Sequence, residues 1–443
     1  MDLIKSISGI RGIFDKTLNQ KISSKYAQIF SSIQPQGDIL IAQDSRPHGK
    51  FIYNAILKSL INLGRNVRSC GIIPTPTAQF IIKDKNLAGG IVVTASHNPI
   101  EWNGLKFLDS DGCFLNADKM EELLSGTPET ITIEKGDIIE SEDAYLKHID
   151  NVLNLECIDT NKIKEKKIKV VVDTVNGAAY KALPKLLEKL NCKVIKIHCK
   201  NTGDFPRGTE PIPSHLGDLT KTVREEKADI GFATDPDADR LAIVNNTGFP
   251  IGEESTLVLA VESYLKFYKD SQTIVTNLST SMGVDVIAKK YNSTVERSSV
   301  GEINVVEKMK ELGSAIGGEG NGGVIIKESH LGRDSLVASA LVLNHLAQSN
   351  LSLNKIMDTL PSFVMIKDKI TLKNDIEFND IKYQFKNETN ITFIEGDGLK
   401  IVWEDKWVHI RKSNTEPIIR IISEAVTSDI AEGLIDSIKQ IVS

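Results

Sequence analysis

The chain has 443 residues, of which 41% are hydrophobic and 25% charged, and its formal net charge is −6. This length exceeds that of one ordinary domain and predicts about three or four domains. The acidic balance argues against a nucleic-acid-binding protein, but it leaves anionic small molecules open because a local cluster of Arg and Lys can reverse the field in a cleft.

The first residues of the chain do not resemble an export signal. They lack the apolar core and cleavage site of a signal peptide, and no later run approaches the roughly 18 apolar residues that span a bilayer. The five cysteines are scattered without paired spacing, which is typical of reduced thiols rather than of a disulfide framework or a zinc site. We therefore expect a cytoplasmic protein without a membrane partner.

One succession of elements is predicted three times: an apolar β-strand, a polar loop, a helix and a second strand. Turn residues at both joints of such a unit are typical of helices layered on a largely parallel sheet. The sequence therefore predicts three related α/β domains with mixed, largely parallel sheets. The predicted units are strand 39–42, a helix to 63 and a strand from 67; strand 170–172, a helix to 190 and strand 194–198; and strand 273–275, a helix to 291 and strand 293–295.

The last part of the chain differs from the rest. From Met365 the β runs are short and amphipathic, with strands predicted at 407–410 and 418–422 and a closing helix at 430–442. This pattern predicts a smaller α+β domain. The predicted domains are 1–150, 151–250, 251–362 and 363–443.

Four segments carry polar side chains that are suited to chemistry, and the first is 89–99. A buried strand is expected to end there and to place Ser96, His97 and Asn98 on a loop. A serine hydroxyl is a poor nucleophile unless a neighbour takes its proton or a metal binds its oxygen. His97 is not readily that base, because adjacent residues of an extended strand point to opposite sides. Taken alone, the segment favours an ordinary polar turn.

The second segment holds Asp235, Asp237 and Asp239 after an apolar run. Three carboxylates can converge on one cation when the backbone wraps around it, and an all-oxygen set suits Mg²⁺. A calcium loop would need Gly at its sixth position and Glu at its twelfth, where this chain has Arg240 and Asn246. An acidic surface turn would not explain why the acids follow a buried strand, so a metal site is favoured.

The third segment is the glycine-rich stretch 317–323. Its glycines match a dinucleotide-binding fingerprint, but the residues 324–326 read as a strand where that motif requires a helix. Glycines let the backbone approach a ligand closely, and Glu319 and Asn321 would suit sugar hydroxyls. A flexible turn explains the stretch equally well.

The fourth segment lies between the two predicted strands 407–410 and 418–422. It contains a dense set of donors, with Arg420 beyond it. Arg supplies a planar fork of donors, and charge-assisted hydrogen bonds to phosphate are strong. A phosphate site is therefore favoured over a solvated hairpin. The donors are Arg411, Ser413, Asn414 and Thr415.

Together and in this order, the four segments resemble the α-D-phosphohexomutase superfamily, which comprises phosphoglucomutases, phosphomannomutases and phosphoglucosamine mutases. The resemblance covers the whole chain, with one segment in each predicted domain, and it is closest to phosphoglucosamine mutases. It implies an isomerase that interconverts a hexose 6-phosphate and a hexose 1-phosphate through a 1,6-bisphosphate. That bisphosphate is also the expected activator.

The resemblance also implies roles for individual residues. Ser96 would be a phosphoserine, and its phosphate would bind one Mg²⁺ together with the three aspartates. Glu319 would grip two ring hydroxyls, and the donors of the fourth segment would hold the phosphate that is not transferred. The residues implied beside the reacting oxygens are Arg11, His97, Lys106 and Arg240.

The favoured substrate is glucosamine 6-phosphate. The Gly-Glu-Gly-Asn-Gly-Gly form of the third segment is similar to archaeal-type enzymes and to some bacterial phosphoglucosamine mutases, whereas many bacterial members have Ser-Gly-His. Glu302 stands where phosphomannomutases carry a His, and a carboxylate near C2 would favour an ammonium group over a hydroxyl. Glu302 is equally explained as a surface acid that caps a helix from Val305.

Three alternatives remain open. Mannose and glucose phosphates are possible substrates of the same reaction. A metal-dependent serine phosphatase would need no second phosphate grip, and a non-catalytic sugar-phosphate sensor would have no use for Ser96 beside three acids. We expect a monomer or homodimer that acts on a small-molecule hexose phosphate and binds no nucleic acid.

Overall fold

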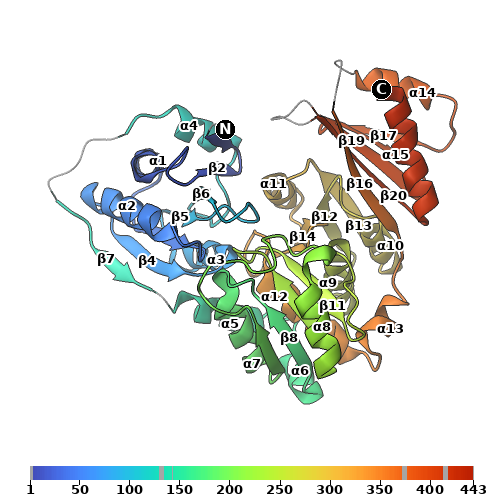
Figure 1. The fold of residues 1–443 in the computed structure, drawn as a ribbon, viewed down its shortest axis with the longest axis horizontal. Coiled ribbons are helices and arrows are strands. Elements are labelled where there is room, and N and C mark those ends of the chain that lie inside the picture. Colours follow the sequence, from blue (N-terminus) through green and yellow to red (C-terminus); the bar gives the residue numbers. More distant parts are fainter. Residues whose placement is uncertain (1–2, 129–133, 142, 372–376, 413–417, 443) are drawn as a thin grey trace.

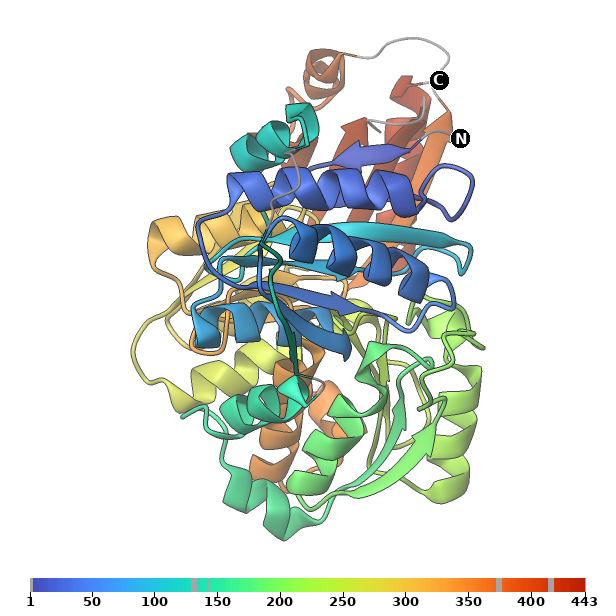
Figure 2. The same ribbon diagram turned by 90° about the vertical axis from the view of Figure 1, so that its left-hand side faces the viewer.

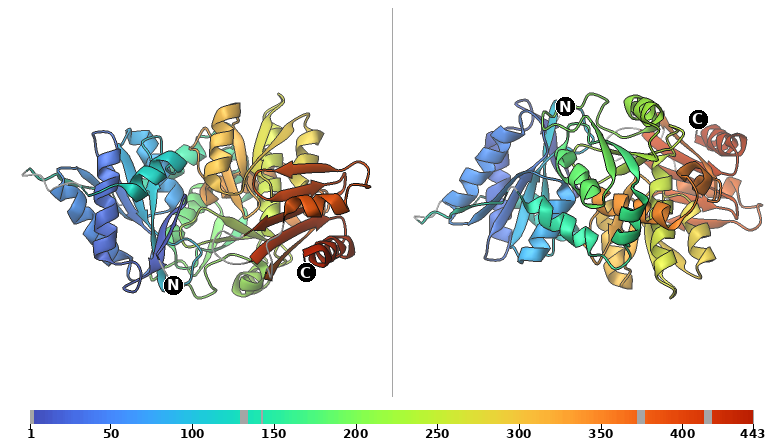
Figure 3. Two further views of the ribbon diagram at one scale, coloured as in Figure 1. Left: turned by 90° about the horizontal axis from the view of Figure 1, so that it is seen from above. Right: turned by 90° about the horizontal axis from the view of Figure 1, so that it is seen from below.

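The computed structural model describes residues 3–128, 134–141, 143–371, 377–412 and 418–442. Over these ranges the chain forms four β-sheets, and each is built from a consecutive part of the sequence. The N-terminal and C-terminal sheets lie on opposite sides of the molecule, with the other two between them (Figure 1, Figure 3). We number them sheets 1 to 4. Within the described ranges, no helix is both long and apolar enough to cross a bilayer.

Sheet 1 is built from the N-terminal third of the chain. Its elements are β1 (Ile4–Ser6), β2 (Gly9–Ile13), α1 (Gln20–Ile33), β3 (Ile39–Gln43), α2 (Gly49–Asn62), β4 (Val67–Ile72), α3 (Thr75–Lys85), β5 (Gly89–Val93), β6 (Trp102–Leu108), α4 (Ala117–Ser125) and β7 (Ile138–Glu140). The strand order is β1-β2-β6-β5-β3-β4-β7, with β5, β3, β4 and β7 parallel and the rest antiparallel. Helices α1, α2 and α4 pack on one face and α3 on the other, and α1 and α2 lie side by side (Figure 2).

Sheets 2 and 3 follow. The elements around sheet 2 are α5 (Ala144–Leu153), α6 (Thr160–Lys166), β8 (Lys169–Asp173), the 3₁₀ helix η1 (Ala178–Tyr180), α7 (Ala182–Lys189), β9 (Lys193–Ile197), the 3₁₀ helix η2 (Pro213–His215), α8 (Gly217–Glu226), β10 (Ile230–Thr234) and β11 (Leu241–Asn245). Those around sheet 3 are α9 (Glu253–Phe267), β12 (Thr273–Asn277), α10 (Gly283–Lys290), β13 (Thr294–Ser298), α11 (Glu302–Leu312), β14 (Ile316–Glu319), β15 (Gly323–Ile326), α12 (Ser335–Gln348) and α13 (Leu353–Met357).

The first three sheets repeat one design. Sheet 2 has the order β9-β8-β10-β11 and sheet 3 the order β13-β12-β14-β15, and sheet 1 contains the matching run β4-β3-β5-β6. In each run three strands are parallel and the last is antiparallel. The three predicted α/β units with mixed sheets are therefore confirmed. Sheets 2 and 3 share one hydrophobic core, because α12 packs against α6 and α7 as well as against α9.

Sheet 4 is antiparallel and has a hydrophobic core of its own. Its elements are β16 (Val364–Thr371), α14 (Phe378–Gln384), β17 (Thr392–Glu395), β18 (Leu399–Val402), β19 (Lys406–Lys412), β20 (Ile418–Ala425) and α15 (Ser428–Val442). The strand order is β16-β20-β19-β18-β17, and the apolar side chains of α15 cover the sheet. The predicted smaller α+β domain is confirmed.

The repeated design gives three of the four candidate segments the same place. The serine segment joins β5 to β6, the aspartate segment joins β10 to β11, and the glycine-rich segment joins β14 to β15. Each is therefore the turn from the third strand of a repeat into its antiparallel fourth strand. Each turn therefore lies at the carboxyl end of one of the parallel strands of its sheet.

Candidate active site

Ser96 lies just beyond β5, is buried, and has a left-handed backbone φ of 49°. This conformation brings Ser96 Oγ within 3.2 Å of His97 Nδ1. The expectation that the two side chains point to opposite sides is wrong, because the backbone is not extended here. Ser96 Oγ also lies 3.2 Å from Asp235 Oδ2 and donates a hydrogen bond to it. The hydroxyl therefore lies between an imidazole and a carboxylate of sheet 2.

Arg46 holds the serine loop in position, and the sequence analysis did not single it out. Its buried guanidinium donates to four backbone carbonyls between Ser96 and Trp102, at distances of 2.6 to 3.0 Å. Arg46 Nε also pairs with Asp44 at 3.0 Å, and Thr94 donates to the same carboxylate at 2.6 Å. The available signal was the Asp-Ser-Arg triplet in the first predicted loop, which is equally compatible with a surface turn.

The three aspartates meet, with one oxygen from each lying within 4.8 Å of the other two. All three side chains are buried. Among the described residues, Asp237 Oδ1 and Asp239 Oδ1 have no hydrogen-bond partner. Burial and the charges of Asp239 and Asp237 raise the pKa of Asp235 well above its usual range. Buried carboxylate oxygens that repel one another and lack donors fit a hard divalent cation such as Mg²⁺.

Lys106 and Thr75 engage the other oxygens of the triad. Lys106 Nζ donates to Asp237 Oδ2 at 2.6 Å and to Asp239 Oδ2 at 3.2 Å, and Thr75 Oγ1 donates to Asp237 Oδ2 at 2.7 Å. Burial opposes ionisation of Asp237, but Lys106 holds the pKa of that carboxyl below its usual range. A lysine from sheet 1 therefore orients two carboxylates of sheet 2.

Two arginines approach the serine loop. Arg11 Nη1 donates to Asn98 Oδ1 at 2.8 Å, and Arg240 Nη2 lies 3.2 Å from His97 Nδ1. Burial, followed by the charges of Arg240 and Arg11, lowers the pKa of His97 to about 3. His97 is therefore neutral near pH 7, and its Nδ1 accepts a hydrogen bond from Arg240. Sequence-predicted residues Ser96, Arg11, His97, Lys106 and Arg240 thus surround one point.

Glu319 ends β14, and protein donors already surround its carboxylate. Glu319 Oε1 accepts from Asn277 Nδ2 at 2.7 Å and from Gly301 N at 3.0 Å. Glu319 Oε2 accepts from Arg333 Nη1 at 2.8 Å and from Asn321 Nδ2 at 3.4 Å. Four donors fill the acceptor capacity of a carboxylate. A sugar hydroxyl that binds Glu319 must therefore displace one of them.

Arg333, which the sequence analysis missed, joins the glycine-rich segment to the aspartates. Its guanidinium pairs with Asp239 at 2.7 Å, with Glu319 at 2.8 Å and with Glu302 at 2.9 Å. All four side chains are buried, and removal of one partner from a buried ion pair is strongly destabilising. Arg333 lies in a Gly-Arg-Asp turn that no sequence pattern separates from a surface arginine.

Glu302 is the first residue of α11, and it is buried. The alternative that described it as a surface acid is therefore wrong, although its place at a helix start is as described. Its carboxylate accepts from Arg333 Nε at 2.9 Å and from Gln79 Nε2 at 3.4 Å. Burial raises the pKa of Glu302 to about 7.

The predicted phosphate segment is described in part. Ser413, Asn414 and Thr415 lie outside the described residues. Arg411 Nε donates to Asp397 Oδ1 at 2.8 Å, and Asp397 Oδ2 accepts from Val300 N at 2.7 Å. Asp397, which the sequence analysis did not name, therefore ties Arg411 of sheet 4 to the loop that precedes α11.

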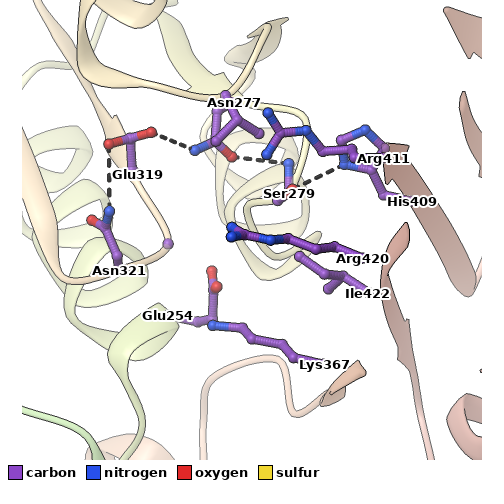
Figure 4. A pocket seen from close by; sticks show the side chains of 12 residues that line it. Glu254, Asn277, Ser279, Glu319, Asn321, Lys367, His409, Arg411, Arg420 and Ile422 are labelled. Carbon is purple, nitrogen blue, oxygen red and sulfur yellow. Dashed lines mark hydrogen bonds between the residues drawn. The ribbon is translucent and has the colours of Figure 1, made fainter. Parts of the chain in front are cut away.

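A cavity of about 200 Å³ lies between sheets 3 and 4 (Figure 4). Three cations of sheet 4 line one wall: Lys367, Arg411 and Arg420. Arg411 and Arg420 are register partners on β19 and β20, so their side chains share a face of the sheet. The opposite wall carries Glu254, which the sequence analysis missed, together with Asn277, Glu319 and Asn321. Cations facing acids and amides suit a phosphorylated sugar.

The structure thus gathers the predicted residues into two adjoining groups. One surrounds Ser96 and the aspartates, and the other lines the cavity with Glu319, Asn321, Arg411 and Arg420. Arg333 bridges them through its pairs with Asp239 and Glu319. Glu302 lies against Arg333 and is not part of the cavity wall.

A second buried cluster of possible metal ligands lies elsewhere. Asp334 accepts from Leu336 N at 2.8 Å and so caps α12, while its other oxygen lies 2.9 Å from His148 Nε2 and 3.3 Å from His330 Nε2. Asp334 thus lies against both imidazoles, and the cluster joins α5 to the start of α12.

Comparison with known proteins gives consistent results along the whole chain. Four family models match in order: phosphoglucomutase/phosphomannomutase α/β/α domain I over residues 3–132, domain II over 143–248, domain III over 253–363, and the C-terminal domain over 367–441.

Two relatives and one solved structure show how far the likeness extends. A phosphoglucomutase/phosphomannomutase of Thermococcus kodakarensis is 33% identical over 97% of this chain and 96% of its own. A phosphoglucosamine/phosphogalactosamine mutase of Sulfurisphaera tokodaii is 32% identical over 98% of both chains. A crystal structure of a phosphoglucomutase/phosphomannomutase family protein from Burkholderia thailandensis has a TM-score of 0.84, with 23% identity, and covers 99% of this chain and 97% of that chain.

Proposed function

Because the chain belongs to the phosphoglucomutase/phosphomannomutase family of the α-D-phosphohexomutase superfamily, whose members are intramolecular phosphotransferases, we propose that it converts glucosamine 6-phosphate to glucosamine 1-phosphate. The reaction would proceed through a phosphorylated Ser96 and a 1,6-bisphosphate, which would also serve as activator. One observation carries the proposal. The Ser96 hydroxyl lies 3.2 Å from Asp235 of a buried aspartate triad, and Arg333 connects that triad to a cation-lined cavity through its pairs with Asp239 and Glu319.

The first half-reaction transfers the phosphoryl group from Ser96 to the free hydroxyl of the bound sugar phosphate. The bond from phosphorus to Ser96 Oγ breaks and a bond to the sugar oxygen forms. On balance, the proton of the sugar hydroxyl passes to Ser96 Oγ, which becomes a free hydroxyl. Arg11, Lys106 and Arg240 would neutralise charge on the phosphoryl oxygens, because catalysis of such transfers depends mainly on positioning and electrostatics. Asp235, Asp237 and Asp239 would hold Mg²⁺, which when bound supplies positive charge to the same phosphate.

The second half-reaction returns the other phosphate of the bisphosphate to Ser96. The bond from its phosphorus to the sugar oxygen breaks, a bond to Ser96 Oγ forms, and on balance the serine proton passes to the sugar oxygen that leaves. The Ser96 hydroxyl must then lose its proton, and His97 Nδ1 and Asp235 Oδ2 both lie 3.2 Å from Ser96 Oγ. The phosphate that is not being transferred would lie against Arg411 and Arg420, with Ser413, Asn414 and Thr415 as further donors.

The choice of glucosamine rests on the relatives. Several relatives of about the same similarity, among them those of Methanopyrus kandleri and Pyrococcus furiosus, are named probable phosphoglucosamine mutases. The proposal does not depend on Glu302, because that carboxylate is paired with Arg333. Mannose 6-phosphate and glucose 6-phosphate are the competing substrates.

The test compares the three 6-phosphates with purified protein, Mg²⁺ and a trace of hexose 1,6-bisphosphate. The highest kcat/KM is expected for glucosamine 6-phosphate. A higher value for the mannose or glucose compound would overturn the choice of sugar. Release of inorganic phosphate without formation of any hexose 1-phosphate would contradict the proposed mutase activity and favour a phosphatase.

A further inference from the structure

Glu254 directs its carboxyl group into the cavity, and most of the hydrogen-bonding capacity of that group is unused. It lies in the first turn of α9, and Figure 4 shows its side chain directed between the Glu319 wall and Arg420. Among the described residues its one hydrogen-bond donor is Ser281 N, at 3.0 Å from Glu254 Oε2. Glu254 Oε1 is therefore available to a ligand.

Glu319, the acid that the sequence predicts to bind the sugar, has no hydrogen-bonding capacity left for a ligand. Its two oxygens accept four hydrogen bonds from the protein at 2.7 to 3.4 Å. Of the two carboxyl groups in the cavity wall, Glu254 is the one that can accept a hydrogen bond from a ligand without losing one of its own.

The glycine-rich segment is shaped around this carboxyl group. A Cβ atom on Gly320 would lie 1.9 Å from Glu254 Oε2, and essentially no real Cβ approaches an oxygen that closely. Any side chain at position 320 would displace the carboxyl from its present place. Gly320 therefore brings the backbone of the loop close to Glu254, rather than close to a ligand as its composition suggested.

The Glu254 carboxyl itself favours a cationic ligand group, in a cavity whose other wall carries Lys367, Arg411 and Arg420. Burial raises the pKa of Glu254 to about 8, Lys367 lowers it, and Glu424 and Glu253 raise it further. A carboxyl held near neutrality by desolvation ionises when an ammonium group binds beside it. The resulting charge-assisted hydrogen bond is roughly twice as strong as a bond between neutral groups. A hydroxyl in the same place gives only a single weaker bond.

A phosphate bound by the cations of sheet 4 would set the orientation in which a substrate meets this group. A phosphate that pairs with Arg411 and Arg420 leaves the sugar ring between that wall and the wall of Glu254 and Asn321. Ring substituents are then the part of the ligand that reaches Glu254 Oε1.

We propose that Glu254 is a specificity-determining residue that contacts the ring of the bound substrate and selects a hexosamine phosphate over the corresponding hexose phosphate. This inference rests on the proposed mutase function, and it names a residue that neither the four sequence segments nor the family match identified.

The test measures binding apart from turnover. Dissociation constants of glucosamine 6-phosphate and glucose 6-phosphate are determined by calorimetry in EDTA for the wild type and for Glu254→Gln, which preserves shape and the Ser281 contact. The wild type should bind the amino sugar more tightly. The preference should fall by about tenfold to a hundredfold in Glu254→Gln, because a hydrogen bond to a charged group is lost. Gly320→Ala, which displaces the carboxyl, should reduce the preference in the same direction.

Glu253→Gln is the matched control. The carboxylate of Glu253 pairs with Lys367 at 3.4 Å and is not in the cavity wall, so its loss should weaken both sugars equally and leave their ratio unchanged. Two results would contradict the role of Glu254 without affecting the proposed mutase function. One is an unchanged ratio of the two dissociation constants in Glu254→Gln, and the other is a wild type that binds glucose 6-phosphate more tightly than glucosamine 6-phosphate. If the wild type binds the amino sugar more tightly but no isomerisation occurs in the turnover assay, the proposed mutase function is wrong and the role of Glu254 in binding still holds.

Discussion

Ser96 shows how backbone conformation decides the chemistry of a residue. A left-handed φ is uncommon for a residue other than glycine, and it persists where surrounding contacts impose it. Here Arg46 donates to the Ser96 carbonyl at 2.7 Å, and Thr94 accepts from Ser96 N at 2.9 Å. The strained turn places the hydroxyl against both His97 and Asp235.

If Ser96 carries the transferred phosphoryl group, intact-mass spectra of the purified protein should show a partly phosphorylated species. Ser96→Ala should lose that species and nearly all mutase activity, because no other group would donate to the sugar. Ser110→Ala, which removes an exposed serine hydroxyl, is the control and should change neither. Full activity of Ser96→Ala would contradict the mechanism.

Glu254 should also give the protein a pH-dependent stability. Its pKa is raised from an ordinary 4.5 to about 8, so between these values the folded chain holds a proton that the unfolded chain has lost. The stability that this proton contributes is full below pH 4.5 and is lost as the pH rises toward 8. Urea titrations from pH 5 to pH 8.5 should therefore show the wild type losing more stability than Glu254→Gln. If the free energy of unfolding changes with pH in the same way for both proteins, the raised pKa of Glu254 is contradicted.

Residues that act through distant contacts were the ones that the sequence could not reveal. Ser96, the aspartates and Arg411 stand in short segments whose composition suggests their chemistry. Arg333 and Glu254 do not. Arg333 gains its role from Asp239, which lies 94 positions away, and Glu254 from a turn around residue 281 and a glycine at 320. Such contacts depend on how the sheets pack.

At the scale of elements, local patterns predicted well. The strands at 39–42, 170–172 and 273–275 and the helices after them were found, because apolar runs and turn residues reflect forces within a few positions. The expected extended backbone at Ser96 was wrong, since the turn is imposed by Arg46 from another loop. The division into domains stays a prediction, and the single core shared by sheets 2 and 3 shows that packing does not follow it simply.

The aspartate turn between β10 and β11 should bind Mg²⁺ even without substrate. Three buried carboxylates repel one another, so a cation that binds only the folded state should raise the melting temperature. At a hundred times its Kd, Mg²⁺ should stabilise the protein by about 2.7 kcal/mol. Asp237→Asn should lose most of this shift, and chelation should abolish turnover until Mg²⁺ is restored.

The exposed acid Asp358 offers the control for that experiment. Asp358→Asn should show the wild-type response to Mg²⁺ in both melting and turnover. If Mg²⁺ raises the melting temperature of Asp237→Asn and of the wild type equally, the triad is not the metal site.

At the scale of the whole molecule, hydrogen bonds and ion pairs connect the two ends of the site. Arg411 is paired with Asp397, which accepts from the loop before α11, and Gly301 of that loop donates to Glu319. Arg333 continues the chain of contacts to Asp239. The contacts run from sheet 4 through sheet 3 to the aspartate turn of sheet 2.

If Arg411 holds the phosphate that is not transferred, Arg411→Ala should impair the enzyme without preventing phosphorylation of Ser96, which lies in sheet 1. Loss of a charged partner to a bound phosphate costs about 2–5 kcal/mol, so kcat/KM should fall by roughly 30-fold to a few thousand-fold. Lys412→Ala is the matched control, because neighbouring side chains on β19 point to opposite faces. Unchanged kinetics in Arg411→Ala would remove this residue from the site.

Because sheet 4 has a hydrophobic core of its own, we expect it to be able to move as a rigid body without disrupting a packed core. Its contacts to sheet 3 include hydrogen bonds from Lys400 Nζ to Leu278 O at 2.6 Å and between Ser279 Oγ and His409 Nδ1 at 2.9 Å. Such bonds each contribute about 1 kcal/mol net, far less than disrupting a packed core would cost. In the proposed reaction, a bisphosphate that offers first one phosphate and then the other to Ser96 would have to turn end for end. A hinge between sheets 3 and 4 would open the cavity for that rotation while the serine and aspartate turns stay assembled.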